Sequence, residues 1–117
     1  MKRFTNFHEW IDQVTGCVGI TSYGKQELGE IVYVELPKVG QIVNMGEAVC
    51  VVESTKAATD VHSPITGRII ETNDLLVADP SGLNREHSWL YKIDPSSRAE
   101  LDRLMDQIEY EEFIAGN

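Results

Sequence analysis

The sequence contains one pattern twice, first as Val34-Glu35-Leu36-Pro37-Lys38-Val39-Gly40-Gln41-Ile42 and then as Val61-His62-Ser63-Pro64-Ile65-Thr66-Gly67-Arg68-Ile69. Both segments read V-x-x-P-x-x-G-x-I, and an apolar run follows each of them, at 48–50 and 75–77. Proline ends a strand because it lacks an N–H donor, and glycine lets the chain turn into the next strand. The pattern therefore predicts two strand–turn–strand units, each forming half of a flattened barrel about an approximate two-fold axis. Chance sharing of proline and glycine is the alternative, which four matched positions at one offset disfavour.

Short segments rich in β-branched and aromatic residues surround the repeat, with turn residues between them, and this favours a β-sandwich or small barrel. We expect strands at 31–34, 42–43, 48–53, 59–62, 68–72 and 89–93. Helical signals occur twice. Thr21 is a candidate N-cap for a short helix that ends near Gly29. Near the C-terminus, Ser97 and Glu100 form a predicted capping box, and Leu101, Leu104, Met105 and Ile108 follow with helical spacing.

The chain has 117 residues, which fits one domain spanning 1–117, and its formal net charge is −9. So acidic a chain repels phosphate backbones, which disfavours nucleic-acid binding. The longest apolar run, 48–52, is too short to span a membrane, and no apolar run follows Lys2 and Arg3, so we expect neither a membrane anchor nor a secretory signal. We therefore expect a cytoplasmic protein.

The cysteine and histidine residues do not form a recognisable metal-binding pattern. Cys17 and Cys50 lie far apart in strand-like segments, with no histidine or cysteine partner at metal-ligand spacing. Buried structural thiols are the preferred interpretation, with a disulfide as the minor alternative. The sequence also lacks a phosphate-binding glycine loop and a nucleophile elbow. We expect no metal site and no autonomous catalytic centre.

Lys56 lies between the two copies of the repeat, in a polar segment with strand-like residues on both sides. This placement predicts a hairpin with Lys56 at its tip, although no Asn-Gly or Asp-Gly pair marks the turn. Most lysines at hairpin tips are ordinary solvated charges, and that is the alternative to any chemical role.

The segment Glu53-Ser54-Thr55-Lys56-Ala57 resembles the lipoylation motif of the glycine cleavage system H protein family. Further matching segments follow in the family's order along nearly the whole chain: His8-Glu9-Trp10, Val18-Gly19-Ile20-Thr21, Leu28-Gly29-Glu30, Val34 to Gly40, Ser63 to Gly67, and Trp89 with Lys92. The resemblance implies a mainly β, hybrid barrel-sandwich fold of two pseudo-two-fold related halves, with a short N-terminal helix and a C-terminal helix. It also implies lipoate in amide linkage to Lys56. Biotin carriers usually have methionine on both sides of their lysine, whereas Thr55 and Ala57 flank Lys56 here.

The resemblance also implies roles for three carboxylates. Glu53 and Asp60 would help to present Lys56 and its arm; the alternative is that they only keep the tip soluble. Glu9 and Asp60 would hold the ammonium of an aminomethyl group carried on the arm. The protein would then be a monomeric, non-catalytic carrier of aminomethyl groups and reducing equivalents. Its expected partners are a lipoate ligase or a lipoyl/octanoyl transferase, glycine decarboxylase, aminomethyltransferase and dihydrolipoamide dehydrogenase.

The sequence departs from the family pattern at three places. Phe7 stands where a small polar residue is common, Glu27 where histidine sometimes occurs, and the segment 84–89 is shorter than usual. These departures keep a second hypothesis open, in which the protein donates lipoate to other proteins or serves another redox or protein-modification system. A third hypothesis is an unmodified interaction module that retains only the scaffold.

Overall fold

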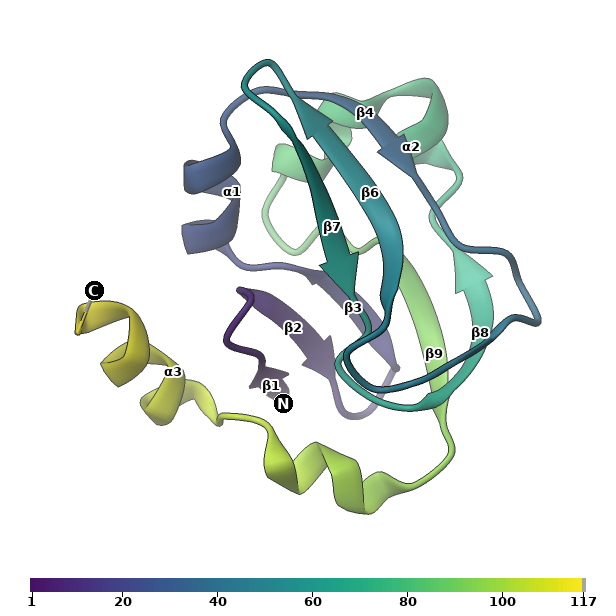
Figure 1. The fold of residues 1–117 in the computed structure, drawn as a ribbon, viewed down its shortest axis with the longest axis vertical. Helices are drawn as coiled ribbons and strands as arrows, with labels where there is room; N and C mark the ends of the chain where they lie inside the picture. Colours follow the sequence, from purple (N-terminus) through teal and green to yellow (C-terminus); the bar gives the residue numbers. More distant parts are fainter. Residues whose placement is uncertain (117) are drawn as a thin grey trace.

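The computed structural model describes residues 1–116, which form two β-sheets with short helical segments around them (Figure 1). The larger sheet has the strand order β1-β2-β3-β9-β8-β5, and the smaller has the order β4-β6-β7. The strands are β1 (Lys2–Phe4), β2 (Glu9–Asp12), β3 (Cys17–Ile20), β4 (Ile31–Glu35), β5 (Ile42–Val43), β6 (Ala48–Ser54), β7 (Ala58–His62), β8 (Gly67–Thr72) and β9 (Tyr91–Pro95). The helices are α1 (Ser22–Leu28), α2 (Leu75–Ala78), the 3₁₀ helices η1 (Pro80–Asn84) and η2 (Arg98–Arg103), and α3 (Gln107–Ala115).

The two copies of the repeat form equivalent parts of the two sheets. The first copy connects β4 to β5, and the second connects β7 to β8. β4 and β7 lie on opposite sides of β6 in the smaller sheet, while β5 and β8 pair with each other in the larger one, with Ile42 opposite Arg68 and Val43 opposite Gly67. Antiparallel pairing of equivalent strands is what a two-fold relation between the units produces. The predicted mainly β barrel-sandwich is confirmed.

The glycines at the equivalent position of the two copies are required for different physical reasons. Gly40 has φ +93° in an open turn, as predicted. Gly67 is needed for another reason, because a Cβ there would collide with the backbone oxygen of Asp94 in β9. The predicted extension of the repeat is wrong for its second copy: residues 48–50 lie in β6, but Leu75, Leu76 and Val77 form α2. Asp74 begins that short helix, and only Leu76 of the three apolar residues is buried.

The hydrophobic core lies between the two sheets. Val34 and Val52 of the smaller sheet belong to the same buried cluster as Val18, Ile69 and Ile93 of the larger sheet. Each of these side chains is at most 2% exposed. Each sheet contributes one apolar face to this core.

Both cysteines are free thiols. Cys50 is buried in β6, as predicted, and this burial raises the pKa of its thiol. Cys17 in β3 is only partly buried, so the prediction of a buried thiol holds for one of the two.

The N-terminal helix forms as predicted. The side chain of Thr21 accepts a hydrogen bond from the Gly24 N–H at 3.1 Å, and the helix ends at Gly29, which has φ +84°. A positive φ favours glycine at a helix C-terminus because no Cβ is present to clash.

The predicted C-terminal helix is wrong in its start and in its apolar face. Ser97 makes no capping hydrogen bond, and Glu100 instead accepts from the N–H and hydroxyl of Thr66 at 2.7 and 3.0 Å. The segment forms η2, breaks, and resumes as α3 with a capping box between Asp106 and Glu109. Ile108 is 68% exposed, because the break changes which residues face the core.

Three strands at the N-terminus were not predicted individually. β1 pairs with β2, β2 with β3, and β3 with β9, so this part of the larger sheet is linked to the rest through β9. Phe4 and Met105 exchange two backbone hydrogen bonds, at 2.8 and 2.9 Å, which bring the C-terminal segment to the free edge of β1. α3 then lies beside β1 (Figure 1).

Candidate functional site

The predicted hairpin is present, and Lys56 lies in its tip between β6 and β7. The Ser54 N–H donates to the Ala57 carbonyl at 2.9 Å and closes the turn. The Ser54 hydroxyl accepts from the N–H groups of Lys56 and Ala57 at 3.1 and 3.3 Å. A serine side chain therefore supplies the turn hydrogen bonds, which explains how the hairpin forms without Asn-Gly or Asp-Gly. Lys56 itself is exposed.

The hairpin tip is held against the connection between α1 and β4, and Figure 1 shows the two segments together at the top of the molecule. The Thr55 N–H donates to the Glu30 carbonyl at 3.1 Å. A Cβ placed on Gly29 would lie 3.5 Å from Cε of Lys56 and 3.8 Å from its Nζ. The aliphatic part of Lys56 thus lies along a stretch of backbone that bears no side chain.

Glu53 and Asp60 lie on the same face of the hairpin. Glu53 pairs with Ala58, and Asp60 is two residues farther along β7, where side chains return to the same face. Glu53 is partly buried and Asp60 is exposed. Within residues 1–116, neither carboxylate forms an ion pair with Lys56, so the lysine's ammonium is not neutralised by the tip itself.

Glu9 is a buried carboxylate, with the residue only 2% exposed. Its Oε2 accepts from the His62 N–H at 2.6 Å, and its Oε1 accepts from the Thr5 hydroxyl at 3.0 Å. The Nδ1 atom of His62 lies 3.4 Å from Oε2. Burial raises the pKa of Glu9, and the hydrogen bonds from His62 and Thr5 oppose this shift without cancelling it.

Glu9 and Asp60 line one cleft of about 300 Å³ without touching each other. The cleft follows β7 away from the hairpin tip, and a strand rise of about 3.3 Å per residue puts His62, beside Glu9, roughly 13 Å beyond Ala58. Glu27 adds a third carboxylate. The apolar part of the lining consists of Phe7, Ile20, Leu28 and Val61. An apolar chain that ends in a cation suits this lining.

The structure thus separates the four predicted site residues into two groups. Lys56 and Glu53 belong to the hairpin, outside the cleft, whereas Glu9 and Asp60 line it. The sequence analysis missed Thr5 and His62, which hold Glu9. His62 directly follows the valine of the second repeat, and this position, at the end of a predicted strand, is the sequence signal that could have identified it.

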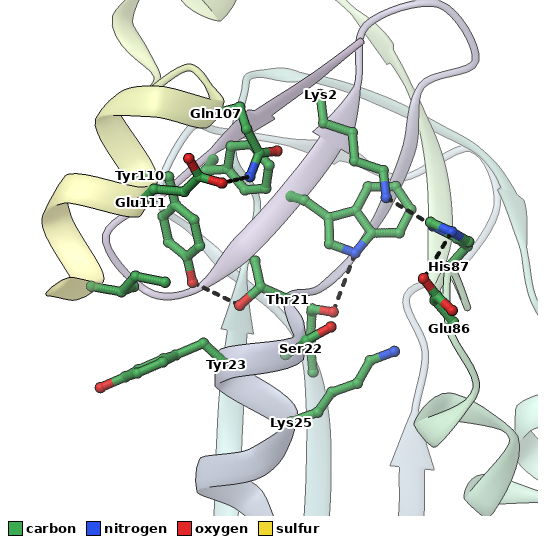
Figure 2. Close-up of a pocket in the computed structure, with 14 residues that line it drawn as sticks. Lys2, Thr21, Ser22, Tyr23, Lys25, Glu86, His87, Gln107, Tyr110 and Glu111 are labelled. Atoms are coloured by element: carbon green, nitrogen blue, oxygen red, sulfur yellow. Dashed lines mark hydrogen bonds and ion pairs between the residues drawn. The ribbon is translucent and has the colours of Figure 1, made fainter.

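The loop that carries Glu9 is connected to α3 through His8. His8 has φ +67°, and its Nδ1 lies 2.8 Å from the Tyr110 hydroxyl. Tyr110 also contacts the Thr21 hydroxyl at 2.7 Å, as Figure 2 shows for the neighbouring pocket. This pocket, of about 290 Å³, contains both signs of charge: Lys2 lies over the Trp10 ring and within 3.4 Å of His87 Nδ1, and His87 pairs with Glu86. Its lining does not include Lys56.

Neither a metal centre nor a membrane span is found in the part of the chain that the structure describes. No group of three or more potential His, Cys, Asp or Glu ligands occurs within residues 1–116. None of the helices in that range is long and apolar enough to cross a membrane.

Comparisons with known proteins match almost the whole chain. Residues 2–117 match the family model described as glycine cleavage H-protein. The glycine cleavage system H protein of Thermotoga maritima is 42% identical over 120 residues, covering 98% of this chain and 97% of the relative. That of Bradyrhizobium diazoefficiens is 43% identical over 117 residues, covering 96% of each chain. The crystal structure of a glycine cleavage system H protein from Mycobacterium marinum superimposes with a TM-score of 0.86 at 35% identity, covering 97% of this chain and 96% of that one.

Proposed function

The chain belongs to the glycine cleavage H-protein family and functions as a lipoyl carrier of the glycine cleavage system; from this premise we propose that Lys56 is the residue that carries the lipoyl arm. The observation that supports this most directly is the position of Lys56. It is exposed at a hairpin tip that backbone hydrogen bonds fix, and the cleft with Glu9 and Asp60 begins beside that tip.

The residues around Lys56 fit a covalently attached arm. Its ε-amine, once deprotonated, is a nucleophile that can form an amide with an activated acyl group. Gly29 leaves free space beside the lysine stem, and Thr55 ties the turn to Glu30, so a modifying enzyme meets one extended side chain on a fixed support. The dithiolane of a lipoyl group supplies the group transfer and two-electron redox chemistry when it is attached.

The carboxylates of the cleft would act on the end of the arm. Glu9 is held in place by His62 and Thr5, and Asp60 lines the same cleft, so a terminal ammonium there would be attracted by two carboxylates. Such charge-assisted contacts would slow loss of an aminomethyl group to solvent. Glu53 remains at the tip, where its role would be presentation of Lys56.

Partner enzymes would supply all of the catalysis. We propose that a lipoate ligase or lipoyl/octanoyl transferase modifies Lys56, and that glycine decarboxylase, aminomethyltransferase and dihydrolipoamide dehydrogenase use the arm in turn. The net charge of −9 favours partners with basic surfaces around their clefts, and such docking weakens with salt. The two free thiols fit a reducing compartment such as the cytoplasm.

The attachment site is tested by the intact mass of the protein after co-expression with a lipoate ligase. We expect one lipoyl adduct on the wild type and on Lys38→Ala, which removes another exposed lysine in a different turn, and none on Lys56→Ala. An adduct that persists in Lys56→Ala would show that the arm is elsewhere. A wild type that is never modified would favour the unmodified interaction module.

The cargo is tested separately, by exchange of labelled bicarbonate into glycine with glycine decarboxylase. We expect the lipoylated protein to support exchange and the Lys56→Ala variant to give only background. A lipoylated protein that supports no exchange, yet passes its lipoyl group to another lipoyl domain through a transferase, would identify the relay function instead.

A further inference from the structure

Phe7 is an exposed aromatic side chain held in a fixed position beside Glu9. The residue is 57% exposed, and its ring stacks on the ring of His62 with centroids 4.4 Å apart. The hydroxyl of Thr5 accepts from the N–H groups of both Phe7 and Glu9 at 3.2 Å, so one side chain holds the backbone of both residues. The loop therefore places the aromatic ring and the carboxylate together.

Phe7 forms the wall between two hollows. On one side is the cleft with Glu9 and Asp60, and on the other is an apolar hollow of about 400 Å³ whose lining includes Met45, Pro64 and Phe113. Phe7 and Glu9 line both hollows. Because Phe7 stacks on His62, at the end of β7 away from Lys56, its ring lies at the far end of the cleft.

At this end of the cleft, an ammonium group would meet an aromatic ring in addition to carboxylates, and this combination suits a cation better than carboxylates alone. A cation beside an aromatic face gains electrostatic attraction from the ring, and the gain is larger where water is excluded. We infer that Phe7 is a positioning and specificity-determining residue for the cationic, amine-bearing end of the lipoyl arm, with its ring against the ammonium that Glu9 and Asp60 attract. This inference rests on the proposed function for the identity of the arm.

The reaction that Phe7 would slow is hydrolysis. One water is consumed, the S–CH₂ and CH₂–N bonds of the thioaminal break, and the products are the thiol, formaldehyde and ammonium. The reaction has no redox change and needs no co-reactant other than water. Because Phe7 lines both hollows, its ring would hinder water in the neighbouring hollow from reaching the carbon, whereas a small side chain would leave that path open.

A first experiment uses the protein without its arm, so its result does not depend on lipoylation. n-Butylammonium is titrated into ¹⁵N-labelled protein, and the amide shifts of Leu28 and of 59–61 are followed. We expect these amides to shift in the wild type and in Val39→Ser, which changes an exposed apolar residue that neither hollow contains. In Phe7→Ser the affinity should fall about fivefold, within the range of measured cation–π effects. The affinity of Phe7→Ser for neutral n-butanol should fall less than its affinity for the cation.

Phe7→Leu keeps an apolar wall but lacks the aromatic face, and it guards against a variant that fails to fold. We expect its affinity for n-butylammonium to lie between those of the wild type and Phe7→Ser, with an unchanged thermal melting curve. Equal affinity of all three proteins for the cation would overturn the inference. An equal loss of affinity of Phe7→Ser for n-butylammonium and n-butanol would also overturn it, because Phe7 would then act only through its shape.

A second experiment measures how long the loaded arm survives after glycine decarboxylase is removed, as formaldehyde released over time. Release should be about fivefold faster in Phe7→Ser than in the wild type, since the same interaction is lost. Identical release rates would contradict the role of Phe7. Failure of the wild type to load at all would contradict the proposed function, and the titration would still decide the role of Phe7.

Discussion

The hairpin tip and the Glu9 end of the cleft are built in opposite ways. At the hairpin tip, backbone groups and the Ser54 hydroxyl hold the turn, and within residues 1–116 the side chain of Lys56 adds no hydrogen bond or ion pair to it. At the other end, the side chain of Glu9 is itself the acceptor that holds the His62 backbone and the Thr5 hydroxyl. We therefore expect that Lys56 can be modified without loss of the turn, whereas a change at Glu9 alters the stability of the fold together with the site.

The largest effect is expected from Lys56→Arg, which should abolish lipoylation and leave stability unchanged. Arginine keeps the positive charge but is not deprotonated in proteins, so lipoylation should be lost completely. The free energy of unfolding should change by less than about 0.5 kcal/mol, as for other exposed positions. Intact mass and urea unfolding measure the two quantities. A clear loss of stability would mean that the lysine side chain does help to hold the tip.

Glu9→Ala should give the opposite result, with a loss of about 3 kcal/mol in the free energy of unfolding. The His62 N–H and the Thr5 hydroxyl would lose their acceptor in a buried place, which costs roughly 1 to 3 kcal/mol for each group. Glu9→Gln keeps one acceptor oxygen and should lose about 1 kcal/mol. Urea unfolding of unmodified protein provides the measurement. Alanine and glutamine variants as stable as the wild type would show that Glu9 is not structural.

The tip was predictable from sequence and the other end was not, for a physical reason. Lys56 lies in a local motif that its neighbours in sequence define. The Glu9 end depends on contacts between residues distant in sequence, such as Glu9 with His62 and Phe7 with His62. β2 was missed because it begins and ends with the acidic residues Glu9 and Asp12, so it lacks the apolar, β-branched run from which the other strands were predicted.

The same reasoning explains the C-terminal error. A serine followed three residues later by glutamate is a local capping signal, but Glu100 is bound instead by Thr66, which lies in the turn between β7 and β8. The α1 prediction was right because its cap, Thr21, has its hydrogen-bond partner Gly24 within the same turn.

Gly29→Ala should disturb the tip moderately. With φ +84°, an added Cβ strains the backbone by about 1 kcal/mol, and the methyl group would also lie against the stem of Lys56. We expect slower lipoylation, measured as adduct formation over time with purified ligase. Gly40→Ala is the matched control, because Gly40 has φ +93° with open space around it. It should lose similar stability and be lipoylated at the wild-type rate; equal slowing in both variants would point to strain alone.

The smallest expected effect is a pH dependence of the free energy of unfolding that arises from Glu9. Burial raises its folded-state pKa above the ordinary value of 4.5. The resulting contribution to stability is therefore fully present below pH 4.5 and is lost as the pH rises through the folded pKa. Glu9→Gln lacks this titration, so the stability advantage of the wild type over the variant should narrow as the pH rises. Urea unfolding of both proteins on either side of pH 4.5 tests this. A widening advantage would contradict it.

The pairing of β3 with β9 has a consequence for biosynthesis. Within residues 1–116, the first three strands join the rest of the larger sheet through β9, where residues 91 and 92 pair with Val18 and Cys17. At a translation rate of about 5 to 20 residues per second, about 70 further residues take roughly 4 to 14 s to make. During that time the β6–β7 hairpin, whose ladder is local, can already pair, while the loop with Phe7 and Glu9 has no sheet to join. The hairpin with the proposed attachment residue Lys56 can therefore form in the nascent chain before the cleft beside Glu9 is complete.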